Sequence, residues 1–241
     1  MEKKPGFPIF KEKLCYNQWW RRKMKQYQIF FVLLYVPAML LYAYTTGKMN
    51  RKVAAANKIV CSSLFFTVSM VGFLGDSERS TKWLLLFAVF FSMVGDIVLI
   101  WDFVKGGISF LIGNLLFSWY LFMLLKKTSA SFLIFYFLLL FLLLGVLLWL
   151  EKTKKIDLSK LKSFRIYMVS VISQGSLGLL LMLVSDLTKY RILGLGNLLF
   201  MISDYFLALL IFGNQHRTFF RVMNILTYFT GMMLIAIIMG C

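Results

Sequence analysis

Two aspartate residues lie inside long apolar segments, where a charged side chain is unusual. Asp96 occurs in Phe91–Leu99 (FSMVGDIVL), and Asp204 occurs in Leu199–Leu207 (LFMISDYFL). Because an ionised carboxylate is costly in hydrocarbon, an aspartate within a membrane-spanning segment is a candidate functional group. Two carboxyl groups in one site can act as a neutral acid and an ionised partner, as in glycosidases. The structural alternative is an ion pair between Asp96 and Lys58.

The other reactive side chains form no recognisable catalytic or metal-binding pattern. His216 is the only histidine and lies in a predicted loop, so a His-based metal cluster and a Ser–His pair are excluded. Cys15, Cys61 and Cys241 form no CxxC pair, and the HExxH and phosphate-loop motifs are absent from the sequence. We therefore predict no metal site and no cofactor.

The composition is that of an integral membrane protein. Of the 241 residues, 60% are hydrophobic and 15% are charged. Soluble domains have about 45–50% apolar and about 25% charged residues. The segment Ser131–Leu150 contains no charged residue and is long enough, as a helix, to span a bilayer core. Soluble enzymes, disordered chains and disulfide-stabilised secreted domains are excluded.

Charged residues and clusters of Gly, Pro and Asn divide the chain into eight apolar segments. The predicted fold is all-α: a polytopic membrane protein in which residues 28–241 form a bundle of eight transmembrane helices. Residues 1–27 form a basic, aromatic N-terminal tail. The predicted spans are Gln28–Thr46, Asn57–Leu74, Trp83–Trp101, Val104–Leu125, Ser131–Leu150, Ser163–Ser185, Ile192–Phe212 and Thr218–Gly240.

The segments around Asp96 and Asp204 suggest a duplicated four-helix unit. In each segment a small residue precedes the aspartate and a leucine follows it three positions later, and each lies in the third span of a group of four. An even number of helices in each unit would keep the halves parallel, as a 4+4 internal repeat. Chance similarity between leucine-rich helices is the alternative.

Span counting places the two aspartates in the same half of the membrane. The third and seventh spans run in the same direction, so Asp96 and Asp204 both approach the leaflet opposite the N-terminus. The even-numbered spans begin at that leaflet and bring further polar residues to it. We expect the substrate-binding residues to be Lys58, Asn114, Tyr167, Gln174, Ser203 and Tyr228. Interhelical hydrogen bonding is the favoured interpretation of the smaller polar residues, Ser92, Ser118, Ser170 and Asn197.

The excess of basic residues indicates contact with membrane lipids rather than with nucleic acid. The formal net charge is +17, and the basic residues lie at the ends of the apolar segments. The two sides of the membrane carry 14 and 13 Lys and Arg residues, so only the basic tail favours a cytoplasmic N-terminus in the cell membrane. We expect this tail to lie along a leaflet of anionic lipids; a solvated, disordered tail is the alternative.

Three segments resemble, in order and spacing, the motifs of the lysoplasmalogenase (YhhN-like) family of eight-helix membrane proteins. They are Val94–Leu99, Gly113–Phe117 and Gly196–Ala208, and Lys58 and Tyr167 also fit. The resemblance covers most of the chain from the second span onward. It implies cleavage of the vinyl ether bond of a lysoplasmalogen, a lysophospholipid, into a fatty aldehyde and a glycerophospho-base. Asp96 and Asp204 match the two aspartates that this chemistry would need.

The leading hypothesis is therefore a membrane-embedded ether hydrolase with Asp204 as the acid and Asp96 as the ionised carboxylate. One alternative is a protein of the same fold that binds or moves lipids without catalysis. Another is an ion or proton carrier that uses the two aspartates as relay groups. No feature of the sequence specifies an oligomeric state.

The chain departs from the family pattern at three positions. Family members usually carry His where this chain has Asn114, Tyr where it has Phe117, and Gln near the position of Met232. Asn donates and accepts hydrogen bonds, but unlike His it does not bind a proton near neutral pH.

Asn114→His is expected to raise the rate of aldehyde release, or to shift its pH optimum toward about 6–7, where His titrates. Asn114→Leu is expected to weaken lysolipid binding, because it removes a donor and an acceptor. Both effects are measured with purified protein and a lysoplasmalogen. If neither variant changes rate or binding, Asn114 is only an interhelical hydrogen-bonding residue.

Overall fold

In the computed structural model the described residues are 8–46, 51–76, 79–126, 132–157, 162–213 and 218–240. Over these residues the chain is helical without strands, which confirms the all-α prediction. Each helix contains a segment long and apolar enough to cross a membrane, so this is an integral multi-pass membrane protein. The helices are α1 (Pro8–Thr45), α2 (Arg51–Gly75), α3 (Arg79–Val98), α4 (Phe103–Lys126), α5 (Phe132–Lys152), α6 (Lys162–Val184), α7 (Thr188–Phe212) and α8 (Thr218–Ile238).

Several helices extend beyond the predicted spans. α1 begins at Pro8, so much of the predicted tail is a helix continuous with the first span, although its apolar part starts only at Arg22. α2 begins at Arg51 instead of Asn57, because the preceding Arg, Lys and Ala residues favour a helix although two of them are charged. Hydropathy marks the part of a helix inside the membrane and not its ends. Side chains before Arg22 lie outside the described residues, as does His216, so contact of the tail with lipid stays a prediction.

The turn between α3 and α4 begins earlier than predicted. α3 ends at Val98 and not at Trp101, and Asp102 caps the next helix by accepting 3.0 Å hydrogen bonds from the backbone N–H groups of Val104 and Lys105. The bond from Lys105 is the main cause that holds the pKa of Asp102 below its usual value. A capping side chain satisfies N–H groups that have no partner within the helix. This cap fixes the first turn of α4.

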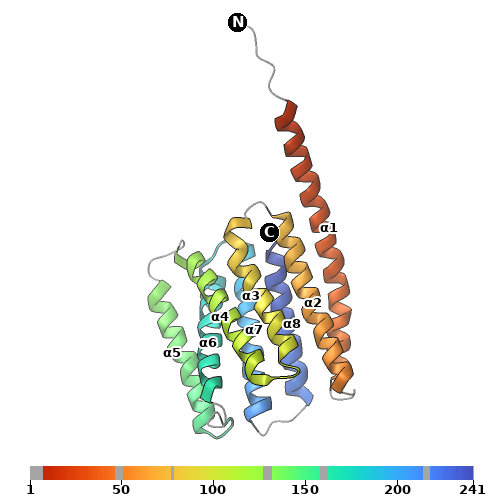
Figure 1. Ribbon diagram of the computed structural model, residues 1–241. Coiled ribbons are helices and arrows are strands. Elements are labelled where there is room, and N and C mark those ends of the chain that lie inside the picture. The colour runs from red at the N-terminus through yellow and green to blue at the C-terminus, as the bar shows by residue number, and fades with distance from the viewer. Residues whose placement is uncertain are drawn as a thin grey trace.

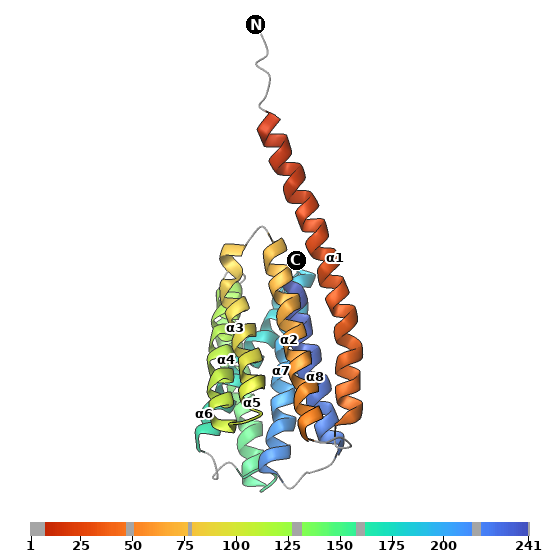
Figure 2. The ribbon, with the colours of Figure 1, turned by 45° about the vertical axis from the view of Figure 1, so that its right-hand side comes forward.

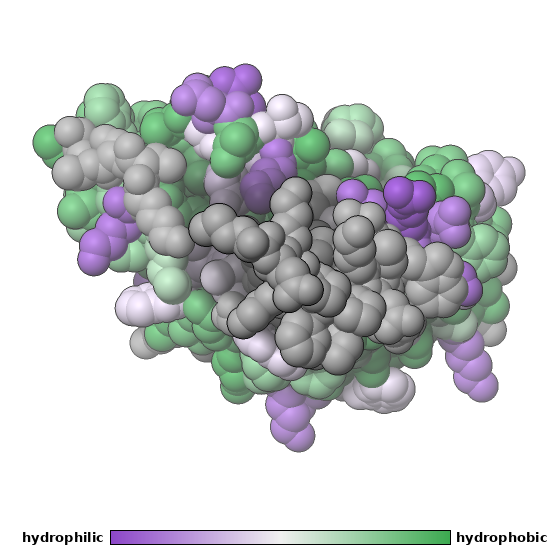
Figure 3. Space-filling view, turned by 90° about the horizontal axis from the view of Figure 1, so that it is seen from above, coloured by the Kyte–Doolittle hydropathy of each residue, from purple (hydrophilic) through white to green (hydrophobic). Residues whose placement is uncertain are grey.

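Six helices form a closed ring. Each of α2, α3, α4, α6, α7 and α8 packs against the next, and α8 returns to α2. Outside the ring, α1 packs against α2 and α8, and α5 packs against α6, at opposite edges of the bundle (Figure 1). The N-terminal part of α1 projects beyond the end of the bundle (Figure 2). Seen from that end, hydrophobic residues cover much of the flanks (Figure 3).

The packing of the first four helices recurs in the last four. α1 packs on α2 as α5 packs on α6, and the α2–α3 and α3–α4 pairs correspond to α6–α7 and α7–α8. The two seams between the halves also correspond, because α4 meets α6 as α8 meets α2. This is the packing order that a 4+4 repeat predicts.

Two close helix contacts fall at equivalent places in the halves. A Cβ atom on Gly113 of α4 would lie 3.2 Å from the carbonyl oxygen of Ala88, and one on Gly231 of α8 would lie 2.7 Å from that of Gly196. Ala88 lies eight residues before Asp96, and Gly196 lies eight residues before Asp204. Small residues allow such close backbone approach in membrane bundles.

Two long polar side chains cap the C-terminal end of α8. Gln28 of α1 and Lys82 of α3 are buried and donate hydrogen bonds of 3.1–3.3 Å to the last carbonyl groups of α8. The last carbonyl groups of a helix lack the partners that a further turn would supply, so donors from other helices help to satisfy them. The carbonyl groups belong to Ala236, Ile237 and Ile238 of α8 and to Met239, which follows it; those of Ala236 and Ile237 also accept backbone hydrogen bonds from Met239 and Gly240.

Gly231→Ala is expected to lower the thermal unfolding temperature in detergent, because the added Cβ forces α7 and α8 apart. Gly145→Ala is the matched control, since a Cβ there meets nothing within 4 Å. This control should be neutral or slightly more stable, because Gly inside a helix costs roughly 0.5–1 kcal/mol relative to Ala. Equal unfolding temperatures for both variants would contradict the close α7–α8 contact.

Candidate active site

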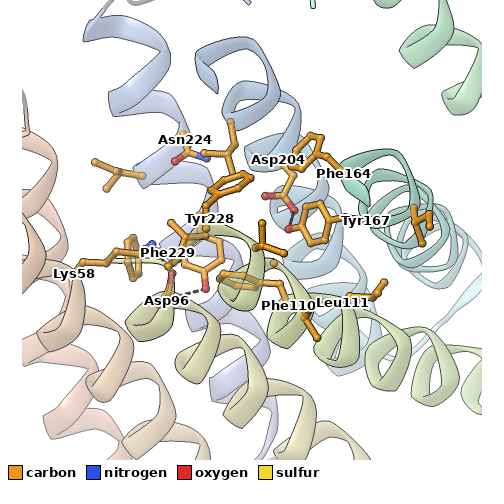
Figure 4. Close-up of a pocket in the computed structure, with 18 of the residues that line it drawn as sticks. Lys58, Asp96, Phe110, Leu111, Phe164, Tyr167, Asp204, Asn224, Tyr228 and Phe229 are labelled. Carbon is orange, nitrogen blue, oxygen red and sulfur yellow. Dashed lines mark hydrogen bonds and ion pairs between the residues drawn. The ribbon is translucent and has the colours of Figure 1, made fainter. Parts of the chain in front are cut away.

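A cavity of about 220 Å³ lies within the ring, in the half of the bundle opposite the N-terminus. Its wall is mostly aliphatic and aromatic. The polar side chains on the wall are Tyr42, Lys58, Asp96, Tyr167, Asp204, Asn224 and Tyr228. Both aspartates therefore face one cavity in the leaflet that span counting indicated (Figure 4).

Asp96 of α3 has three partners from two other helices. Its Oδ1 lies 3.1 Å from the Lys58 ammonium, and its Oδ2 accepts hydrogen bonds from Ser62 at 2.6 Å and from Tyr228 at 2.7 Å. The residue is only 2% exposed. A buried carboxylate is tolerated when it is paired with a cation and hydrogen-bonded, and Asp96 has both kinds of partner. The Asp96–Lys58 ion pair that the sequence analysis gave as the structural alternative is therefore present.

Asp204 of α7 has a different environment. It is 4% exposed, and its Oδ2 accepts a 2.7 Å hydrogen bond from the hydroxyl of Tyr167 on α6. Among the described residues no ion pair to Asp204 occurs. A buried carboxyl group without a cation beside it favours the neutral form. The two carboxyl groups thus lie in different environments, one beside a cation and one without a cation partner among the described residues.

Aromatic packing holds the tyrosine that contacts Asp96. The Tyr228 ring lies 5.4 Å from the ring of Phe200 and 4.8 Å from that of Phe229, measured between centroids. The ring of Phe110 lies 6.2 Å away, in an edge-to-face arrangement. A Cβ on Gly95, which precedes Asp96, would lie 2.7 Å from the Phe110 ring. The ring can pack there because residue 95 has no side chain. These contacts fix the direction of the Tyr228 hydroxyl.

Three of the predicted binding residues lie behind the cavity wall. Asn114 is buried, donates a 3.3 Å hydrogen bond to Ser170 and lies close to the Tyr167 hydroxyl. Gln174 lies deeper in the bundle and donates a 2.8 Å hydrogen bond to the side-chain oxygen of Asn197.

Ser203 turns its hydroxyl back to the carbonyl oxygen of Phe200 in its own helix, at 2.6 Å. The structure therefore brings Lys58, Tyr167 and Tyr228 to the aspartates. It does not bring Asn114, Gln174 and Ser203 to the cavity wall.

Other residues at the site were missed by sequence reasoning. Ser62 lies four residues after Lys58, and Asn224 lies four residues before Tyr228, so each shares a helix face with a residue that was found. That spacing was the available signal. Asn224 lines the cavity and donates a 2.8 Å hydrogen bond to the carbonyl oxygen of Ser203.

The fold and the cavity define a polytopic membrane protein in which two buried carboxyl groups face one apolar cavity. A family model for the YhhN family matches residues 27–239. The chain therefore belongs to the YhhN family, the family of lysoplasmalogenases, which confirms the resemblance noted from its motifs. Searches of curated proteins and of solved structures found no match.

Lys58→Met is expected to destabilise the protein by about 2–3 kcal/mol, because it leaves the Asp96 carboxylate buried without its cation. The effect should be smaller than for a fully buried pair, since the lysine side chain is 18% exposed. The double variant Lys58→Met/Asp96→Asn is the matched control and should recover most of the loss. Thermal or denaturant unfolding in detergent measures both. An equal loss in the single and double variants would contradict the ion pair.

Proposed function

We propose that this protein is a hydrolase of the membrane that cleaves the vinyl ether bond of a lysoplasmalogen. The observation that carries the proposal is the pair of buried carboxyl groups, in unlike environments, on one cavity of a YhhN family member. Such a pair can keep one carboxyl group neutral as an acid and the other ionised.

Asp204 donates its proton to the outer carbon of the vinyl ether double bond, the one that is not bonded to the ether oxygen. The resulting cation shares its charge between the adjacent carbon and the ether oxygen, and the Asp96 carboxylate stabilises it. Water then adds to the carbon that is bonded to the ether oxygen and gives a proton to Asp96. The lipid is now a hemiacetal.

The hemiacetal then collapses. Its hydroxyl proton returns to Asp204, Asp96 delivers the other proton to the glycerol oxygen, and the carbon–oxygen bond to glycerol breaks. The products are a fatty aldehyde and the glycerophospho-base, and both carboxyl groups return to their starting states. The overall reaction consumes one lysoplasmalogen and one water molecule and yields one aldehyde and one glycerophospho-base.

The neighbouring polar groups have supporting roles in this proposal. Tyr228 and Ser62 hold the Asp96 carboxylate by hydrogen bonds, and Tyr167 holds Asp204. Lys58 is partly exposed on the cavity wall, so it can also attract the lipid phosphate. The aliphatic and aromatic wall keeps bulk water from the cation.

Asp96→Asn and Asp204→Asn are each expected to lower the rate of aldehyde release by about 10²–10⁴-fold, the usual contribution of an acid–base group. Asp186→Asn is the matched control, since Asp186 is exposed between α6 and α7 at the other end of the bundle. Mass spectrometry of the products from purified protein and a lysoplasmalogen measures the rates. Full activity in either cavity variant would remove its assigned role.

Lipid binding without hydrolysis is the second candidate function. Asn114 favours it, because the family usually carries a proton-binding His at that position. Tight lysolipid binding with no aldehyde, and binding unaffected by Asp→Asn changes, would identify this function instead.

A further inference from the structure

One face of α4 lines the cavity and also reaches the outside of the bundle. Val104, Gly107, Ile108 and Leu111 all line the cavity, and their spacing places them along one stripe of the helix. Val104 is 47% exposed and Ile108 is 52% exposed. Side chains that contact both the cavity and the outside mark a lateral opening.

α6 supplies the other side of this opening. Ile166 lines the cavity, is 65% exposed, and belongs to a helix that packs directly against α4. Both residue sets lie within segments apolar enough to cross a membrane, Phe103–Lys126 and Phe164–Val184. The opening therefore lies on the flank of the bundle, at the ends of two segments that are apolar enough to cross a membrane.

The Lys58–Asp96 ion pair and the apolar stripe of α4 lie at different sides of the cavity. Lys58 and Asp96 lie toward α2, whereas Leu111 of α4 lies on the far side, where Tyr167 of α6 also lies (Figure 4). An amphiphile with one hydrocarbon chain matches this distribution, with its polar end near the lysine and its chain toward α4 and α6.

Gly107 keeps the opening wide. A Cβ atom added there would meet nothing within 4 Å, whereas one on the adjacent Gly106 would lie 2.8 Å from the backbone of Leu99. Close helix packing thus explains Gly106 but not Gly107. A glycine within a helix is less favourable than alanine, and at this position it leaves open space beside the cavity.

We propose that the hydrocarbon chain of a single-chain lysophospholipid lies in the opening between α4 and α6 and passes Gly107. The residue at position 107 then determines which chains are accepted. This inference rests on the proposed function, because it assigns the ether end of the same lipid to the two carboxyl groups.

The first experiment compares Gly107→Leu with Gly145→Leu, a matched change at a second glycine whose Cβ would meet open space, on α5 away from the cavity. Aldehyde release is measured with lysoplasmalogens that carry a hexadecenyl or a shorter octenyl chain. Gly107→Leu should lower turnover of the long chain by about tenfold or more and affect the short chain less. Gly145→Leu should match the wild type. Identical chain-length profiles for the two variants would overturn the inference.

The second experiment does not depend on turnover. A non-hydrolysable alkyl lysophosphatidylcholine with a diazirine in the middle of its chain is bound to the wild-type protein and photolysed, and the labelled peptides are sequenced. Label on Val104–Leu111 or Ile166 that is suppressed by Gly107→Leu but not by Gly145→Leu supports the inference. If the label is found but no aldehyde is formed, only the proposed hydrolysis fails. Label elsewhere, or equal labelling by a two-chain phosphatidylcholine probe, would overturn it.

Discussion

The burial of the Asp96 carboxylate is the interaction on which the rest of the site depends. A charge persists inside a membrane bundle only when it is paired and hydrogen-bonded, and Lys58 and Ser62 of α2 and Tyr228 of α8 meet that requirement. α2 belongs to the first half of the chain and α8 to the second. The residues that contact the Asp96 carboxylate therefore also link the two halves at one seam.

The other seam between the halves, where α4 packs against α6, has different side chains at the level of the cavity. Residues such as Val104, Ile108 and Ile166 line the cavity there and also face outward, and no charged side chain of the described residues lines it on that side. At the level of the cavity, an ion pair links α3 to the α2–α8 seam, whereas apolar side chains and the unobstructed Gly107 line the α4–α6 seam. The recurring packing thus provides two equivalent seams, and their side chains differ in charge and exposure.

The same asymmetry separates the two carboxyl groups. Tyr228 lies three residues before Gly231, and at the equivalent place, three residues before Gly113, the chain has Phe110. The tyrosine donates a hydrogen bond to Asp96, whereas a phenylalanine has no hydroxyl to offer. The recurring helix packing therefore positions two similar carboxyl groups, and the side chains that contact them differ.

The sequence by itself determined the membrane class, the eight helices and the half of the bilayer that contains both aspartates. Hydropathy and helix length are local properties, and direction alternates with each span. It did not determine which polar residues share the cavity, because depth along a helix leaves rotation about its axis open. Packing against neighbouring helices sets that rotation. It therefore turned Gln174 toward Asn197 and Ser203 toward its own helix, and it brought Ser62 and Asn224 to the site.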